Sequence, residues 1–482
     1  MNRKPTFYVA QLIVVIAITS VFSIEHLYLT GNNELYYTAS QKDDSFNRYF
    51  EEWASISLLY KKIGIDLRYE AHIPPAPGNY NTETRHGISL RTLSFQSKMI
   101  TIKAGHFYTI LGRGLTLRTF EKRELGWDTK IDGLLFKYVN EKIDLTLLGG
   151  IPYSANGLKY DPLEAGEISF MPHDFLQLGA TMVLTNRPLH NSYWESLYLS
   201  LNLPFGSIYT EYASQTLSEL FKPDTTKALY ITTTLFIKDF SLLAEYKYYM
   251  DFNLDQGMVY NNPPPVTKEH FFALLNRHQL LSNADDELGF LFEATYPVIE
   301  DNLLTVSYGY STNKNRTAKY HDFYTQLGFQ LPQTFDWILA TGFQKENWNR
   351  HITMIFNPTW NINNRYSLKL EFQHQHTAVK DFENYIKIPK FYTQYYSVSL
   401  GIYPDISISI FIETTTDKFA QSDFKIERNR IWIGGELGLT ILESHNLTFF
   451  AGTRRGGKNC TTGICKNEPA LKGIELKITS NF

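Results

Sequence analysis

The chain is poor in cysteine and, beyond its first residues, in long apolar runs. Only two cysteines occur among its 482 residues, and two thiols alone do not make an ordinary metal site. After Ser23 no stretch is apolar over the roughly 20 residues that a membrane-spanning helix needs. The sequence therefore excludes a helical membrane protein.

Other familiar features are also missing. The formal net charge is −3, which gives no electrostatic reason to expect nucleic acid as a partner. No linker rich in Pro, Gly or Ser divides the chain. It contains no Gly-x-Ser-x-Gly motif, no His-Glu-x-x-His motif and no convincing Ser–His–Asp set. We therefore predict a protein that is not an enzyme and that uses neither a cofactor nor a metal.

The first residues predict export. Arg3 and Lys4 precede an almost wholly apolar stretch from Phe7 to Phe22, and Val21 and Ser23 supply the small residues of a cleavage site. This is the pattern of a secretory signal peptide, predicted over residues 1–23 and cut after Ser23. The mature chain, residues 24–482, would then be exported.

The main pattern in the mature chain is strict alternation of apolar and polar residues. Residues 63–73 read IGIDLRYEAHI, so the isoleucines fall on one strand face while Asp66, Arg68 and Glu70 fall on the other. The alternation is as long as a tilted membrane-crossing strand, about 9–11 residues. Similar segments begin near residues 240, 288, 366 and 406. Membrane strands must satisfy their backbone hydrogen bonds sideways, which predicts a closed barrel with a polar lumen.

The connections also alternate in length, as they do in transmembrane barrels. Short turns are predicted at Lys61–Lys62, Ser97–Lys98, Asn140–Glu141, Pro204–Gly206, Lys238–Asp239, Tyr403–Asp405 and Leu442–Asn446. Longer outer loops are predicted at 74–85, 152–172, 251–284, 378–389 and 455–470.

The last residues, GIELKITSNF, form an amphipathic strand that ends in Phe482. Such an ending looks like the signal that the barrel-assembly machinery reads. We therefore predict an all-β protein, a single transmembrane antiparallel β-barrel in the cell outer membrane. We expect roughly 22 strands, with 14 to 24 allowed. The strand count is least certain in regions 151–207 and 111–130.

Tyrosine (32) and phenylalanine (33) are abundant, which suits a membrane interface and would also suit a carbohydrate-binding β-protein.

Segment 109–133 departs from clean alternation and is dense in Gly, Arg and Glu. One interpretation is a constriction or internal plug that selects solutes. The other is a packed, salt-bridged wall of a polar lumen. The candidate lumen-lining residues are Arg113, Arg118, Glu121, Arg123 and Glu124.

Two further segments are unusual. Segment 251–284 contains three consecutive prolines followed by a short helix-like stretch from Glu269 to His278, and it is a second candidate to fold into the lumen. Cys460 and Cys465 both lie in the predicted last outer loop, with Gly463 between them to allow a turn. An oxidising compartment favours a disulfide between them.

Four stretches resemble a family of uncharacterised outer-membrane β-barrels of Gram-negative bacteria, a domain of unknown function. They are GNNELYY (31–37), LGRGLTLRTFEKRELGWDTKIDG (111–133), NNPPPVTKEHFFALLNRH (261–278) with DDELGF (285–290), and RRGGKNCTTGICKNEPALKGIELKITSNF (454–482). The resemblance implies the barrel fold, the outer-membrane location and a loop with paired cysteines. It supplies no catalytic or binding residues.

The sequence favours a porin-like channel or transporter for an unnamed solute, because the inner face is polar and charged. The alternative is an accessory or scaffold barrel that docks another envelope protein. The partners that we expect are outer-membrane lipid, the barrel-assembly machinery during biogenesis and, for the alternative, that envelope protein.

Overall fold

The fold is described from a computed structural model of the chain. The structure describes residues 26–482 except for 43–44, 76–83, 124–126, 154–158, 187–190, 219–223, 251, 253–260, 262–265, 267, 277–285, 300–301, 332–333, 347–348, 380–389, 418–420, 423–424, 427–429, 462–463 and 469. The predicted signal peptide, residues 1–23, lies outside this part. Within it, none of the helical segments is both long enough and apolar enough to span a membrane.

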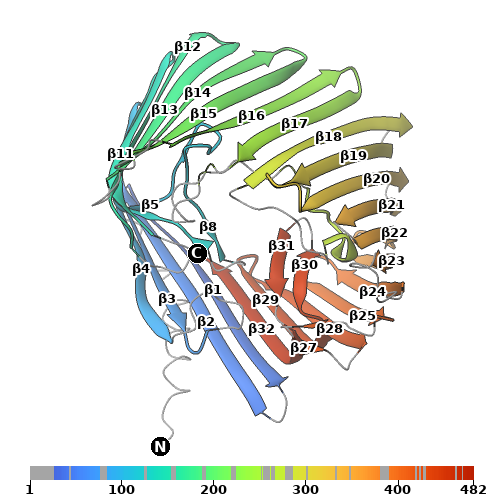
Figure 1. Ribbon diagram of the computed structural model, residues 1–482. Coiled ribbons are helices and arrows are strands. Elements are labelled where there is room, and N and C mark those ends of the chain that lie inside the picture. Colours follow the sequence, from blue (N-terminus) through green and yellow to red (C-terminus); the bar gives the residue numbers. More distant parts are fainter. Residues whose placement is uncertain are drawn as a thin grey trace, which may run out of the picture.

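The described strands form one closed antiparallel ring (Figure 1). The sheet has 24 strands, and each pairs with its neighbours in chain order. The ring closes because β1 pairs both with β2 and with the last strand, β32. The predicted barrel is therefore confirmed, at the upper limit of the expected strand number.

The strands of the ring are β1 (Leu27–Lys42), β2 (Ser45–Tyr60), β3 (Ile63–His72), β4 (Arg85–Gln96), β5 (Ile100–Phe107), β10 (Ile131–Val139), β11 (Ile143–Pro152), β12 (Leu163–His173), β13 (Leu176–Asn186), β14 (Asn191–Leu203), β15 (Gly206–Ser218), β16 (Asp224–Ile237), β17 (Phe240–Met250), β18 (Asp286–Ile299), β19 (Asn302–Thr312), β20 (Lys319–Leu331), β21 (Phe335–Glu346), β22 (Asn349–Asn361), β23 (Tyr366–Val379), β24 (Phe391–Ile402), β25 (Ile406–Thr415), β28 (Ile431–Ile441), β29 (His445–Arg454) and β32 (Leu471–Asn481). Short elements outside the ring are β6 (Ile110–Leu111), β7 (Leu117–Arg118), β8 (Glu121–Lys122), β9 (Trp127–Asp128), the 3₁₀ turn η3 (Ala273–Asn276), β26 (Gln421–Ser422), β27 (Lys425–Ile426), β30 (Gly457–Thr461) and β31 (Ile464–Glu468).

The alternation read from the sequence sorts the side chains between the two faces of the ring. On β3, Ile63, Ile65 and Leu67 are exposed on the outer face, while Arg68 is buried on the inner face. On β25, Ile410 is 61% exposed on the outside and Glu413 is buried on the inside. On these strands the outer face is thus apolar and the inner face polar, as predicted.

The predicted short turns are observed, and one predicted loop needs a correction; most of the predicted loops 74–85, 251–284 and 378–389 lies outside the described residues. All seven predicted short turns fall where consecutive barrel strands connect at one end of the ring, although Gly206 and residues 445–446 already belong to β15 and β29. The predicted loop 152–172 is wrong in its second half, because residues 163–172 belong to β12. There Leu163 and Ala165 are buried on the inner face while Ile168 and Phe170 are exposed on the outer face. Apolar residues on both faces conceal the period of two, which is why this strand did not show in the sequence.

The ring closes between β1 and β32, and Gly31 and Phe482 lie at one end of this strand pair. Their backbones exchange two hydrogen bonds: the Gly31 N–H donates to the Phe482 carbonyl (2.7 Å) and the Phe482 N–H donates to the Gly31 carbonyl (3.0 Å). The Phe482 ring lies over Gly31, where a Cβ atom would stand 2.2 Å from it. The terminal aromatic residue therefore packs on the strand pair that closes the barrel; its role as an assembly signal stays a prediction.

We predict that Gly31→Val weakens this closure, because the new side chain must displace the Phe482 ring. Overpacking of this kind costs about 1–3 kcal/mol of unfolding free energy. The measurement is urea unfolding of the refolded barrel, followed by its heat-modifiable gel migration. Gly328→Val on β20 is the matched control, since the nearest atom to a Cβ there is 3.9 Å away. Equal unfolding midpoints for the two variants would contradict the prediction.

Candidate functional site

The chain between β5 and β10 leaves the ring and lies against its inner wall (Figure 1). It turns at Gly112 and Gly114, which have φ of +55° and +94°. A Cβ atom at Gly112 would stand 2.6 Å from Oε1 of Glu211 on β15. Glycine is therefore required at position 112 both for the backbone angle and for the approach to the wall.

Carboxylates of the wall hold this turn through the backbone. Glu211 is fully buried and accepts hydrogen bonds from the Arg113 N–H (2.8 Å), the Ser196 hydroxyl (2.8 Å) and the Tyr209 hydroxyl (2.8 Å). The Gly112 N–H donates to Glu167 on β12 (3.2 Å). A buried carboxylate is costly unless its oxygens are satisfied, so these bonds stabilise the turn in one position.

Apolar side chains seal the same contact. Leu111, Leu115 and Leu117 have no exposed surface and pack in one buried cluster with the wall residues Val183 and Trp194. Burying a leucine side chain contributes about 1.5–3 kcal/mol. The segment from 110 to 118 is therefore a packed lining of the barrel interior.

An ion-pair chain fixes the other end of the inward segment. Arg123 contacts Glu34 on β1 (2.9 Å) and Glu121 (3.2 Å), and Glu121 contacts Arg68 on β3 (2.7 Å). Arg68 also pairs with Glu70 (2.8 Å). These charges compensate one another, which a partly buried ionic group requires.

Tyr108, at the start of the segment, donates a hydrogen bond to Asp128 (2.8 Å) near this ion-pair chain. Burial raises the pKa of the Tyr108 hydroxyl above its ordinary value, and the negative charges of Asp128 and Glu121 raise it further. The hydroxyl therefore stays protonated and remains a donor to Asp128.

The structure places four of the five candidate lumen residues, and Glu124 lies outside the described residues. Glu121 and Arg123 belong to the ion-pair chain, whereas the Arg113 guanidinium lies 5.0 Å above the Tyr209 ring on β15. Arg118 lies 5.0 Å above the Phe120 ring of its own segment. The candidates thus form two separate groups.

A second inward lining comes from the described residues between β17 and β18. The 3₁₀ turn η3 binds the inner wall through glutamine side chains: Gln375 donates to the Leu274 carbonyl (2.7 Å) and Gln373 accepts from the Leu274 N–H (2.9 Å). Just before η3, His270 Nε2 contacts the buried Asp322 carboxylate on β20 at 2.5 Å. The predicted helix over 269–278 is observed only as this 3₁₀ turn, and 277–278 lie outside the described residues.

The wall residues that hold both linings were not singled out from the sequence. Glu211, Asp322 and Gln373 occupy ordinary inward positions of alternating strands, where any polar residue fits. The only sequence cue for them would have been a long polar side chain on an inner face.

The last long connection carries the two cysteines. β30 and β31 form a hairpin whose backbone register places Cys460 opposite Cys465. β30 lies beside η3, inside the ring (Figure 1). At its base, Arg454 pairs with Glu475 (3.1 Å) and Arg455 pairs with Glu413 (3.4 Å).

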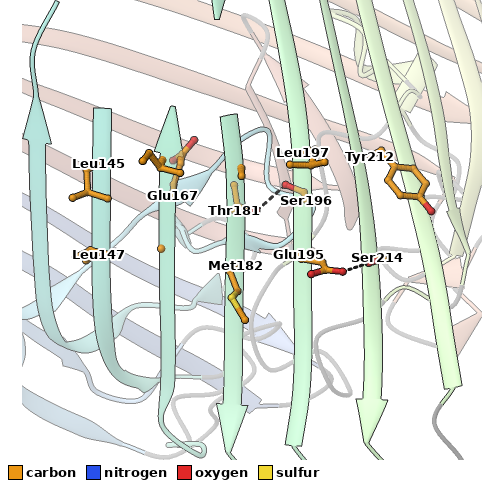
Figure 2. Close-up of a pocket in the computed structure, with 13 residues that line it drawn as sticks. Leu145, Leu147, Glu167, Thr181, Met182, Glu195, Ser196, Leu197, Tyr212 and Ser214 are labelled. Carbon is orange, nitrogen blue, oxygen red and sulfur yellow. Dashed lines mark hydrogen bonds between the residues drawn. The ribbon is translucent and has the colours of Figure 1, made fainter. Parts of the chain in front are cut away.

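A separate groove lies on the outer face, across β11 to β15 (Figure 2). It has a volume of about 590 Å³ and forms where the small residues Gly166 and Ala180 leave space beside Met182 and Leu197. Its one outward carboxylate, Glu195, accepts a hydrogen bond from the Ser214 hydroxyl (3.0 Å); the other lining residues are Leu145, Leu147, Glu167, Ile168, Thr181, Ser196 and Tyr212. Because it opens outward, the groove is not part of the lined interior.

Among the described residues, no group of three or more His, Cys, Asp and Glu side chains could hold a metal ion.

Comparisons with known proteins agree with this architecture. Residues 6–162 match a family of unknown function (DUF6029), which is less than half of the chain. This match confirms the resemblance to an uncharacterised family. No curated protein sequence matches the chain.

Solved structures show the fold. The P pilus usher (PapC) translocation pore aligns over 95% of this chain and 99% of its own, with 10% identity and a TM-score of 0.52. The E. coli P pilus tip assembly intermediate PapC-PapD-PapK-PapG aligns over 96% of this chain and 62% of its own, with 9% identity and a TM-score of 0.57. The outer membrane protein opdK from Pseudomonas aeruginosa aligns over 74% and 100%, with 10% identity and a TM-score of 0.41. At these identities the likeness concerns the fold alone, and the third score is too low to support an argument.

We predict that Cys460 and Cys465 form a disulfide. Directly opposed positions of an antiparallel pair have Cβ atoms about 4.5–5.5 Å apart, close to the distance that the bond requires. The test is mass spectrometry of exported protein alkylated before and after reduction. Alkylation of both thiols without reductant would show that the bond is absent. Cys460→Ser, which leaves one thiol free to react, is the control for alkylation.

Proposed function

We propose that the protein is a porin-like channel of the outer membrane whose interior is narrowed by two inward linings. The proposal rests on the exposure of inward-pointing side chains on the wall between β25 and β29. There Glu436 and Ser407 point inward and are exposed. Water therefore reaches the inside of the ring at this wall, while the linings cover the walls of β12–β15 and β20–β23.

The outer-membrane location is supported by the exposed apolar belt. Leu134 (64%), Leu197 (68%) and Met354 (63%) are exposed on the outer faces of strands far apart in the ring. A soluble protein rarely exposes so continuous an apolar surface, whereas lipid solvates it without cost. The likeness to the usher pore supports the same location.

A second candidate function is an accessory barrel that docks another envelope protein. It is favoured by the likeness to the usher, which in one aligned structure belongs to an assembly intermediate with other proteins. Co-purification of a stoichiometric envelope protein in mild detergent would support it. A monodisperse single protein, obtained from the native envelope, would count against it.

We predict discrete conductance steps from the refolded barrel in planar bilayers. We further predict that Gly112→Ala changes the conductance, because the new Cβ meets Glu211 and the left-handed backbone angle becomes strained, which displaces the turn that Glu211 holds. The cost of such a clash is about 1–3 kcal/mol.

Gly149→Ala on β11 is the matched control, because the nearest atom to its Cβ would be 3.8 Å away. Heat-modifiable migration establishes that each variant is folded. No current from a folded wild-type barrel would overturn the channel proposal, and an unchanged conductance in Gly112→Ala would show that this lining does not narrow the path.

A further inference from the structure

Aromatic rings lie side by side on the inner wall that the linings leave accessible. Tyr395 on β24 and Phe411 on β25 have ring centroids 5.9 Å apart and planes inclined by 20°. Phe411 and Phe450 on β29 have centroids 6.0 Å apart and planes inclined by 19°. The three rings are nearly parallel and span the wall from β24 to β29.

The strand between Phe411 and Phe450 makes room for them. Gly434 on β28 is paired in register with Phe411, and a Cβ atom there would stand 2.7 Å from the Phe411 ring and 2.6 Å from the Phe450 ring. The two rings therefore meet over a position that has no side chain. Any other residue at position 434 would separate them.

Part of this platform is open to the lumen. Tyr395 and Phe411 are partly exposed, whereas Phe450 is buried (3%) beneath the Arg454 guanidinium, 5.2 Å from its centroid. Phe450 thus supports the platform and the other two rings present its accessible surface. The inner faces of the same strands continue with hydroxyl groups, including Ser409, which donates to Ser399 (2.9 Å).

Two ion pairs lie beside the platform. Arg454 is held by Glu475 and Arg455 by Glu413, so these four groups offer no net charge to a solute. The wall therefore combines flat apolar rings, hydroxyl groups, two ion pairs and the exposed carboxylate of Glu436. Binding sites are commonly built from aromatic walls and a few polar groups that fix orientation.

From this arrangement we infer that the platform of Tyr395, Phe411 and Phe450 binds neutral sugars. A sugar ring has an apolar face of C–H groups that stacks on an aromatic ring, and a rim of hydroxyls that the serines and Glu436 can meet. The inference rests on the proposed channel, for which it names the class of solute.

The test is single-channel recording with neutral oligosaccharides of glucose, mannose, galactose and xylose added to one side. At least one should interrupt the wild-type current, and Tyr395→Ala and Phe411→Leu should each weaken that block about tenfold. Phe411→Leu keeps an apolar side chain but loses the flat ring. Tyr396→Ala and Phe449→Ala are the matched controls, because these neighbours point outward and should leave the block unchanged.

Calorimetry of the same folded barrel, in a detergent without a sugar head group, measures sugar binding directly. It therefore separates the proposed sugar site from the proposed channel. An open pore that no oligosaccharide blocks or binds would overturn the sugar site and leave the channel intact. A folded barrel without current that still binds a sugar would overturn the channel and keep the site. Block by indole but by no sugar would show that the platform binds aromatic solutes instead.

Discussion

Pairing of every strand edge is the constraint on which the rest of this structure depends. An apolar outer face leaves backbone N–H and C=O groups no partner except the neighbouring strand. The ring meets this demand completely only because β32 returns to β1, where Gly31 and Phe482 exchange hydrogen bonds. The inner face is then free to be polar, and its side chains can serve purposes other than holding the sheet together.

One of those purposes is visible in the described residues. Glu211 and Gln375 bind the backbones of inward segments that come from distant parts of the chain. A backbone group removed from water needs a partner, and an inward carboxylate or amide supplies it. The linings are therefore attached to the polar inner face, the face that a solute would contact in a channel. Some parts of the inner wall are covered by the linings, and the other parts stay accessible.

The side chains of the accessible wall are the ones that a solute would contact in the proposed channel. Where the linings end, β24 to β29 present partly exposed rings and hydroxyl groups, with two ion pairs beside them. The likeness to the usher pore is one of fold, so it does not decide between solute passage and docking of another protein. The channel proposal rests instead on the residues of this wall, because stacked rings facing water suit a small solute.

The sequence by itself determined the alternation, the short turns and the apolar outer face, since each depends on residues close together in the chain. It therefore predicted β3 and β25 with their correct faces. It missed β12, because the inward Leu163 and Ala165 are covered by a lining that no local pattern reveals. Only the tertiary structure decided which inward residues meet. Glu211 with Gly112, and Phe411 with Phe450 across Gly434, become neighbours only when the ring and its linings bring distant parts of the chain together.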